Sequence, residues 1–313
     1  MTSLVFMGTP EFSVPILTML HEEGYDILAV VTQPDRPVGR KKVLTPTPVK
    51  KEALRLGYPV LQPEKLRGSQ QLDEILSFNP DIVITAAFGQ ILPKVILDAP
   101  KFGCLNVHAS LLPAYRGGAP IHQAVIDGQD ETGVSIMYMA EKLDAGDIIS
   151  QKSIPIEAND TTGKLFESLS IVGRDLLKET LPSILNETNA RIVQDEKLVS
   201  FARNISREQE RINWNQSAQD IFNLVRGLNP WPVAYTTLQE QPVKVWWGQP
   251  SQQQTNQPIG TVVELKSDRI IVQTGNEQAF EITELQPSGK KKMSAEEFLR
   301  GTGSKLQIGD QFQ

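Results

Sequence analysis

The chain has 313 residues, which exceeds the usual size of one hydrophobic core and predicts about two domains. Hydrophobic residues make up 40% and charged residues 22%, a composition typical of globular proteins that excludes fibrous and disordered classes. The net charge of −6 argues against general binding of nucleic acids, although affinity for phosphate depends on the local arrangement of charge rather than on its sum.

The cysteine content and the first residues bear on the cellular compartment. Because Cys104 is the single cysteine, an internal disulfide is excluded, which favours a reducing compartment. Its apolar neighbours predict a buried structural thiol. The first residues lack the basic region of a signal peptide, and no apolar run reaches the roughly 18 residues of a membrane span. We therefore expect a cytoplasmic protein that does not associate with membranes.

Short apolar runs alternate with amphipathic stretches over residues 1–189, the first expected domain. Strands are expected at residues 4–8, 27–32, 59–63, 81–88, 104–108, 134–139 and 148–154. Helices are expected after the first strand, at residues 49–56 and 69–78, and after residues 160–162. Runs of valine, isoleucine and alanine favour a mostly parallel sheet with helices on both faces. The prediction is an α/β, Rossmann-like domain, whose last helix Pro182 should kink or end.

The texture of the sequence changes after residue 189. Residues 190–206 are polar, mixed in charge and without a sustained period, which predicts a linker. The rest, residues 207–313, contains one expected helix and several short apolar runs separated by turn-rich segments. The helix is expected at residues 217–228, and the strands at residues 233–238, 243–247, 260–265, 270–273 and 280–285. Five short strands in about 80 residues predict a small OB-like β-barrel domain.

A dinucleotide site is disfavoured at the start of the chain. The first strand leads through a turn into a helix, but only Gly8 stands where the dinucleotide fingerprint needs three glycines. No acidic residue closes the next strand. Gly8 is therefore interpreted as a turn at the edge of the sheet, which disfavours a nicotinamide-dependent dehydrogenase.

Asn106 and His108 end the strand expected at residues 104–108. Residues two apart in a strand face the same side, and open α/β sheets place ligand sites at the carboxyl ends of their strands. Asparagine donates to an oxygen that gains negative charge, and histidine exchanges protons near neutral pH. From these two residues alone, a structural histidine is an equal alternative. His21 and His122 are interpreted as structural, and we expect no metal site because no histidines or cysteines have ligand spacing.

Asp144 and Asp147 lie in a tight loop before the strand expected at residues 148–154. Either carboxylate could bond an imidazole. Asp147 could also cap the turn, whereas Asp144 lies at the apex of the loop. Together with Asn106 and His108, a carboxylate here predicts transfer of an acyl group to an amine without a protein nucleophile.

Several motifs together resemble one known family. The segments NVHASLLP, RGGAPI and LDAGDI are similar to those of the folate-dependent formyltransferases. The segments FMGTPEFSVP, TQPDRPVGRKK, FGQILP, ETGVSIM, NPWPVAYT and QPVKVW extend the resemblance over nearly the whole chain. They point to the members of the family that formylate the methionine carried by initiator tRNA. The resemblance implies transfer of the formyl group of 10-formyltetrahydrofolate, as a cosubstrate, to the α-amino group of that methionine.

The resemblance also implies roles for individual residues. Asn106 is expected to polarise the formyl carbonyl, His108 to assist removal of the amine proton, and Asp144 to orient the histidine and its water. The residues expected to contact the folate are Ser110, Leu111, Leu112 and Pro113.

Basic residues gather in the loop of residues 33–51 and again late in the second expected domain. From the sequence alone a solvated, flexible loop is the favoured interpretation, whereas the resemblance implies that the loop approaches the acceptor end of a tRNA. A barrel of the expected kind presents a groove to a nucleic-acid backbone. The expected tRNA-binding residues are Arg36, Arg40, Lys41, Lys42, Lys244, Lys290, Lys291 and Lys292.

Three alternatives stay open at this point. A formyltransferase acting on a small amine, such as an amino sugar or a purine precursor, would use the same three catalytic residues. A hydrolase would pass the formyl group to water, and a non-catalytic tRNA-binding protein would not bind folate. The second domain and its basic residues favour tRNA as the acceptor. No obligate protein partner is expected, and the chain is predicted to be a monomer.

Overall fold

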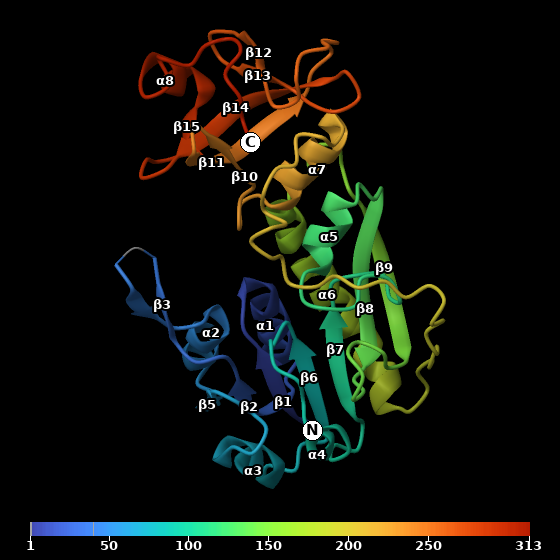
Figure 1. Ribbon diagram of the computed structural model, residues 1–313. Coiled ribbons are helices and arrows are strands. Elements are labelled where there is room, and N and C mark those ends of the chain that lie inside the picture. The colour runs from blue at the N-terminus through green and yellow to red at the C-terminus, as the bar shows by residue number, and fades with distance from the viewer. Residues whose placement is uncertain (1, 40) are drawn as a thin grey trace. The chain divides into compact units, whose positions relative to one another are not determined.

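The computed structural model describes residues 2–39 and 41–313, which form two compact units. The first unit comprises residues 1–120, 131–155 and 166–203, and the second comprises residues 121–130, 156–165 and 204–313. Figure 1 shows the elements of both units in the colours of the chain. Residue 40, and with it the predicted contact of Arg40, lies outside the described residues.

The first unit is built on a seven-stranded sheet with the order β5-β2-β1-β6-β7-β8-β9. Its strands are β1 (Ser3–Gly8), β2 (Asp26–Val31), β5 (Val60–Leu61), β6 (Ile82–Ala86), β7 (Cys104–His108), β8 (Glu131–Tyr138) and β9 (Ile148–Pro155). The pairs from β5 to β7 are parallel, and β8 and β9 add two antiparallel pairs. The predicted α/β class and mostly parallel sheet are confirmed.

Helices cover both faces of this sheet, which explains why its central strands are apolar throughout. The helices are α1 (Val14–Glu22), α2 (Pro48–Leu56), α3 (Gln70–Ser77), α4 (Lys94–Leu97) and α6 (Thr162–Leu185), with a short 3-10 turn at Glu11–Ser13 before α1. On one face, side chains of α3 and α4 pack against Val5, Val83 and Cys104. On the other face, α6 approaches β7 so closely that a Cβ at Gly173 would meet Val107.

Some local features of the first unit go beyond the sequence-based expectation. The basic loop contains a small hairpin formed by β3 (Arg36–Val38) and β4 (Val43–Thr45), which the sequence pattern did not predict. Helix α6 does not end at Pro182 but continues to Leu185. Proline removes a single N–H near the end of the helix, and the N–H of Asn186 still bonds the carbonyl of Pro182 at 3.1 Å.

Gly8 ends β1 where the chain turns toward α1. A Cβ at this position would lie 2.7 Å from Cβ of Ser13 and 3.0 Å from the carbonyl oxygen of Ala86. The hydroxyl of Ser13 donates to that same carbonyl at 2.6 Å. The glycine is therefore required by close packing at the carboxyl edge of the sheet, in line with its interpretation as a turn rather than a phosphate site.

The second unit contains a curled antiparallel sheet with the order β10-β11-β14-β13-β12, in which β15 also pairs with β14. The elements are α7 (Ala218–Gly227), β10 (Tyr235–Leu238), β11 (Gln241–Pro250), β12 (Val262–Leu265), β13 (Ile270–Gln273), β14 (Ala279–Pro287), β15 (Met293–Ser294) and α8 (Ala295–Arg300). Helix α5 (Pro120–Ile126) belongs to this unit from its second residue. Phe312 pairs with Leu238, and Gln311 pairs with Thr261, so the last residues lie between the two edges of the sheet. The barrel-like second fold is confirmed.

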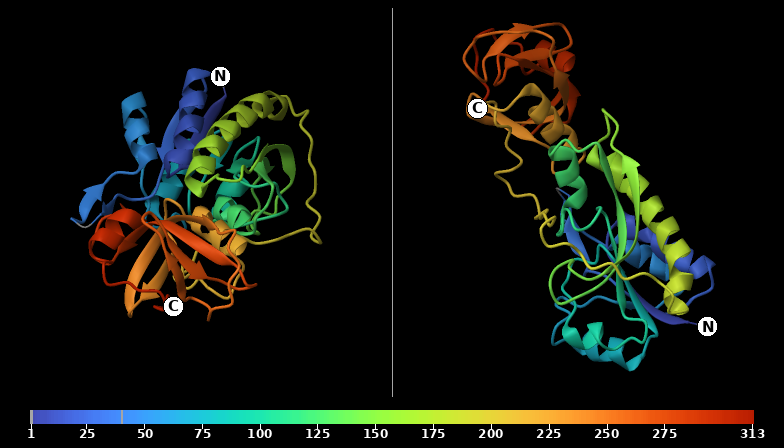
Figure 2. Two further views of the ribbon diagram at one scale, coloured as in Figure 1. Left: turned by 90° about the horizontal axis from the view of Figure 1, so that it is seen from above. Right: turned by 90° about the vertical axis from the view of Figure 1, so that its right-hand side faces the viewer.

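The chain after α6 has no regular secondary structure up to α7, apart from isolated bridges to neighbouring segments. Both views in Figure 2 show this yellow part of the chain as an extended trace. Its bridges join Ile192 to Ile148 and Phe201 to Arg116. The segment therefore lies along the first unit in a defined path, although the sequence pattern suggested only a linker.

Candidate active site

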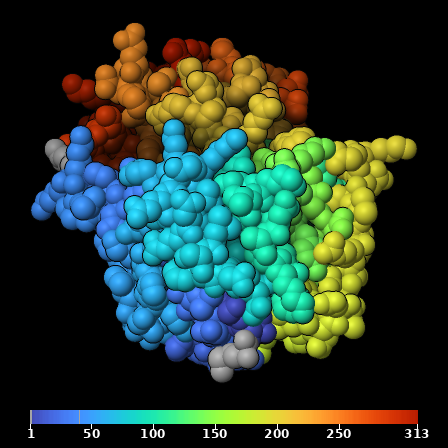
Figure 3. Space-filling model, turned by 90° about the horizontal axis from the view of Figure 1, so that it is seen from below, coloured from blue at the N-terminus to red at the C-terminus, as the bar shows by residue number. Residues whose placement is uncertain are grey.

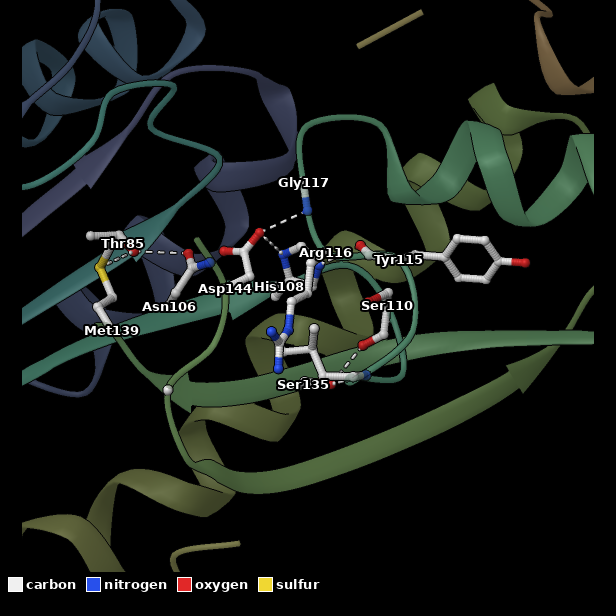
Figure 4. Close-up of polar contacts among 12 residues, drawn as sticks. Thr85, Asn106, His108, Ser110, Tyr115, Arg116, Gly117, Ser135, Met139 and Asp144 are labelled. Atoms are coloured by element: carbon white, nitrogen blue, oxygen red, sulfur yellow. Dashed lines mark hydrogen bonds and ion pairs between the residues drawn. The ribbon is translucent and has the colours of Figure 1, made fainter. Parts of the chain in front are cut away.

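Asn106 and His108 lie on the same side of β7 near its carboxyl end, as alternation along a strand requires. The hydroxyl of Thr85, the neighbour of Asn106 across the parallel pair, lies 2.8 Å from the carboxamide oxygen of Asn106. Because that oxygen faces Thr85, the amide nitrogen of Asn106 points away from Thr85. Figure 4 shows Asn106, Asp144 and His108 converging at this edge of the sheet.

His108 is buried, and its two ring nitrogens have different surroundings. Nε2 lies 3.0 Å from the carbonyl oxygen of Tyr115. Because a carbonyl only accepts, Nε2 carries the hydrogen of this bond, and in the neutral ring the lone pair is on Nδ1. Nδ1 lies 3.8 Å from Oδ2 of Asp144, which is too long for a direct hydrogen bond. A proton taken up by Nδ1 is therefore placed beside a carboxylate.

The carboxylate of Asp144, rather than that of Asp147, lies next to the imidazole. Oδ2 of Asp144 accepts the backbone N–H of Gly117 at 2.8 Å, which holds the carboxylate on the side of His108. Asp147 instead lies 3.9 Å from the guanidinium of Arg191. The two aspartates left open by the sequence are thus distinguished by geometry.

The segment Ser110–Pro113 forms a turn directly after β7. The hydroxyl of Ser135, on β8, accepts the N–H of Leu112 at 3.1 Å and donates to the carbonyl of Ser110 at 2.6 Å. The amide of Gln151 donates to the carbonyl of Leu112 at 2.9 Å. The side chains of Ser110 and Leu112 are buried and these backbone groups are engaged, so the turn presents mainly the half-buried side chains of Leu111 and Pro113.

Thr85, Ser135 and Gln151 support the site, and sequence reasoning did not identify them. Thr85 is the single polar residue of β6, and Ser135 lies between the apolar residues Val134 and Ile136 of β8, which is the signal that could have revealed them. A buried hydroxyl in a strand needs a hydrogen-bond partner, so such a residue points to an ordered polar contact nearby. Gln151 carries no comparable signal because it lies on an exposed stretch of β9.

The thiol of Cys104 lies at the start of β7 and takes no part in this arrangement. Burial raises the pKa of Cys104 to about 12, and the neighbouring Asp98 contributes in the same direction. The thiol lies 3.3 Å from the carbonyl of Ile96. A thiol that stays protonated at neutral pH is not a nucleophile, so the predicted structural role agrees with these surroundings.

The basic residues of the first unit lie on the β3–β4 hairpin. Arg36 is exposed and forms an ion pair of 2.6 Å with Glu64. Lys41 and Lys42 are exposed in the turn of the hairpin. These residues stand apart from the Asn106–His108–Asp144 group, with which no contact is found in the described residues.

The basic residues of the second unit lie on β11 and around β15. The ammonium of Lys244 donates to the carbonyl of Pro232 at 3.0 Å. Lys292 pairs with Glu284 at 2.6 Å and lies over the ring of Trp246. Lys290 and Lys291 are exposed in the turn between β14 and β15.

The described residues contain neither a candidate metal-binding group nor a membrane-spanning helix. In residues 2–39 and 41–313, no group of three or more histidine, cysteine, aspartate or glutamate side chains is arranged to hold a metal ion. None of the helices in the described part of the chain combines the length and the apolar character needed to cross a membrane.

The model of the formyl transferase family matches residues 1–181, and the model of the formyl transferase C-terminal domain matches residues 204–303. The chain belongs to the formyl transferase family.

Among curated relatives, the methionyl-tRNA formyltransferase of Lysinibacillus sphaericus (strain C3-41) is 68% identical over 313 residues, which cover 100% of both chains. The methionyl-tRNA formyltransferase of Bacillus cytotoxicus is 58% identical over 309 residues, covering 99% of this chain and 98% of the relative. Among solved structures, an N-formyltransferase from Helicobacter canadensis, in complex with folinic acid and dTDP-3-aminofucose, has a TM-score of 0.67. It is 18% identical and covers 92% of this chain and 100% of its own. This last likeness concerns the fold.

Proposed function

We propose that this chain transfers the formyl group of 10-formyltetrahydrofolate to the α-amino group of methionine on initiator tRNA. The observation that carries the proposal is the 68% identity over the full length of a methionyl-tRNA formyltransferase. The group formed by Asn106, His108 and Asp144 supplies the acid–base and donor chemistry that this transfer needs. The product would be formylmethionyl initiator tRNA, used to start translation.

The formyl donor supplies an activated carbonyl: the amine nitrogen bonds to its carbon, and the folate nitrogen leaves and takes up a proton. Asn106 fits this chemistry because its carboxamide oxygen is engaged by Thr85 and its N–H groups are turned away from that bond. These N–H groups donate to the carbonyl oxygen as it gains negative charge. Ser110, Leu111, Leu112 and Pro113 form the adjacent turn, which contacts the folate.

His108 receives the proton that the attacking amine loses. The lone pair on Nδ1 is available because Nε2 donates to Tyr115. Once Nδ1 is protonated, the ring carries a positive charge between a carbonyl oxygen and the carboxylate of Asp144, and both stabilise it. At a separation of 3.8 Å, a small movement of the ring brings Nδ1 within hydrogen-bond distance of Oδ2.

Binding of tRNA is assigned to the basic residues of both units. In this proposal residues 1–189 perform the transfer, residues 190–206 connect, and residues 207–313 bind tRNA. The residues in contact with tRNA are Arg36, Arg40, Lys41, Lys42, Lys244, Lys290, Lys291 and Lys292. The protein acts in the cytoplasm, where charged tRNA is present, and as a monomer, which light scattering of the purified protein would test.

The direct test mixes the purified protein with 10-formyltetrahydrofolate and methionine-charged initiator tRNA and follows acid-stable formylmethionine on the tRNA. A charged elongator tRNA, uncharged tRNA and an amino sugar serve as alternative acceptors. Rapid and selective formylation of the initiator tRNA supports the proposal. Transfer to the amino sugar alone would favour the small-amine alternative, and loss of formyl groups without any acceptor would favour a hydrolase.

The same assay tests the catalytic assignment. His108→Ala is expected to lower kcat by about 100-fold to 10,000-fold, while tRNA binding measured by filter retention stays unchanged. His21→Ala is the matched control, because His21 is exposed and contacts only Tyr58 among the described hydrogen bonds of its ring. A His108→Ala protein that formylates at the wild-type rate would remove His108 from the mechanism.

A further inference from the structure

The segment of residues 191–198 reverses the usual pattern of burial. Its apolar residues Ile192, Val193 and Leu198 are exposed, whereas Gln194 is buried with 6% of its surface accessible. A buried amide must satisfy its polar groups inside the protein, because leaving them unpaired costs stability. In Figure 3 the yellow part of the chain, which contains this segment, lies on the surface beside the green part. The burial of Gln194 there points to a specific task.

Each polar atom of the Gln194 amide is used. Its nitrogen donates to the carbonyl of Asp144 at 2.8 Å and to the carbonyl of Gly146 at 2.8 Å. Its oxygen accepts from Nε and Nη2 of Arg116 at 3.0 Å and 2.8 Å. One side chain therefore ties together the loop that carries Asp144 and the loop that follows the turn at Ser110–Pro113.

The backbone of Asp144 needs such support. Its φ of 46° lies in the left-handed region, which a residue with a Cβ adopts only at a cost in free energy. The two bonds from Gln194 hold the carbonyls on either side of Ala145, and the N–H of Gly117 holds the carboxylate itself. The position of the carboxylate beside His108 thus depends on a conformation that Gln194 stabilises.

The partner of Gln194 is held just as firmly. Arg116 is fully buried, and its guanidinium also pairs with Glu196, which in turn pairs with Lys142 at 2.8 Å. These two cations, Lys142 first, hold the pKa of the Glu196 carboxyl below its usual range. The backbone N–H of Arg116 donates to Ser200 at 2.9 Å, and its carbonyl accepts from Ala202 at 2.8 Å. Residues 194–202 are therefore fixed at both ends to the loops of the site.

We propose that Gln194 is a positioning residue for formyl transfer, and that residues 194–202 act as a strap that fixes Asp144 for its work with His108. This role rests on the proposed function, because it concerns the chemical step of that reaction. Gln194 touches no reacting atom and acts through the main chain of the Asp144 loop. The strap thus contributes to the transfer in addition to joining two parts of the chain.

The test compares Gln194→Met and Gln194→Glu with the wild-type protein in the formylation assay. Methionine keeps the length of the side chain and removes all its hydrogen bonds. Glutamate keeps the oxygen that accepts from Arg116 and removes the donors to Asp144 and Gly146. Both variants are expected to lower kcat by about 10-fold to 100-fold, because the carboxylate loses its fixed position. The KM values for the folate and for the tRNA should change by less than about twofold.

Lys197→Met is the matched control. Lys197 lies on the same strap and its side chain is exposed. The Lys197→Met protein should formylate at the wild-type rate. Thermal unfolding of all variants identifies any that fail to fold. If Gln194→Met does not fold, Gln194→Glu still tests the proposal, because it keeps the bond to Arg116. Wild-type kcat in a folded Gln194→Glu protein would overturn the proposal.

A double-mutant cycle separates positioning from general stability. If Gln194 acts through Asp144, adding Gln194→Glu to Asp144→Asn should lower kcat by less than about twofold beyond the single change. Independent, multiplicative losses would show that Gln194 does not act through Asp144 and would overturn the role. If the wild-type protein formylates a small amine instead of tRNA, the proposed acceptor fails and the same cycle is measured with that amine. A wild-type protein that formylates no amine would remove both.

Discussion

Ser135 is a residue whose single hydroxyl holds a whole turn. It accepts the N–H of Leu112 and donates to the carbonyl of Ser110, so removing it leaves two buried backbone groups without partners. We predict that Ser135→Ala lowers the free energy of unfolding by about 1–3 kcal/mol and raises the KM for the folate. Urea unfolding and formylation kinetics measure the two effects. Ser153→Ala, an exposed serine on β9, is the control, and equal behaviour of both variants would contradict the role of the turn.

Cys104 predicts a dependence of stability on pH. Its folded pKa of about 12 is raised above the value of about 8.5 for an exposed thiol, so the unfolded chain loses this proton first as the pH rises. The contribution to stability is fully present below pH 8.5 or so and decreases above it by about 1.4 kcal/mol per pH unit. The cost of Cys104→Ala in unfolding free energy should therefore shrink as the pH rises toward 10. A constant cost between pH 7 and pH 10 would contradict the burial of a protonated thiol.

The loop that contains Gly117 contacts both the strap and the carboxylate of Asp144. Gly117 has a φ of 127°, and a Cβ there would lie 2.4 Å from the carbonyl oxygen of Ala202. Gly117→Ala should therefore push the loop from the strap, move the N–H that holds Asp144, and lower both kcat and the melting temperature. Gly24→Ala is the control, since Gly24 also has a positive φ but has open space around it. Comparable kcat values for the two variants would show that the close approach is unimportant.

The regular elements were the most predictable part of the molecule. The strands β1, β2 and β6 are mainly apolar runs. The period-two placement of Asn106 and His108 put both on one side of β7. Five short strands of the second unit were predicted in the same way, whereas β15 was not. Their patterns depend on local periodicity, which a sequence displays directly.

The connections between distant segments were not predictable from periodicity. Gln194 contacts residues about fifty positions earlier, and nothing in its polar surroundings distinguishes it from a solvated glutamine. The hairpin at β3 and β4 was missed because its short strands are exposed and contain Pro37. The choice between Asp144 and Asp147 required the position of Gly117, which only the folded chain supplies.

At the scale of the whole molecule, an acidic protein with a net charge of −6 must bind a polyanion through local groups of cations. Lys290 and Lys291 are exposed, whereas Lys292 is already paired with Glu284. We predict that replacing Lys290 and Lys291 by glutamine weakens tRNA binding and makes the slope of log K against log salt shallower by about 0.7–0.9 per lost phosphate contact.

The rate at saturating tRNA should remain near the wild-type value in this double variant, because neither lysine belongs to the group around His108. Lys152→Gln, at an exposed position of the edge strand β9, controls for the loss of one positive charge. Weaker binding with an unchanged salt slope would indicate that these lysines do not contact phosphates.

The strap also determines where this protein could be recombined with a relative. The first family match ends at residue 181 and the second begins at residue 204, so the strap belongs to neither of them. A chimera joined at residue 189 would receive a foreign strap against the native Arg116 and Asp144 loop, whereas one joined after Arg203 keeps the native strap. We expect the second chimera to show the higher kcat with the same tRNA, and equal values would mean that straps are interchangeable. If the second chimera is the faster one, residues 194–202 have to be inherited together with the loops of Arg116 and Asp144 that they contact.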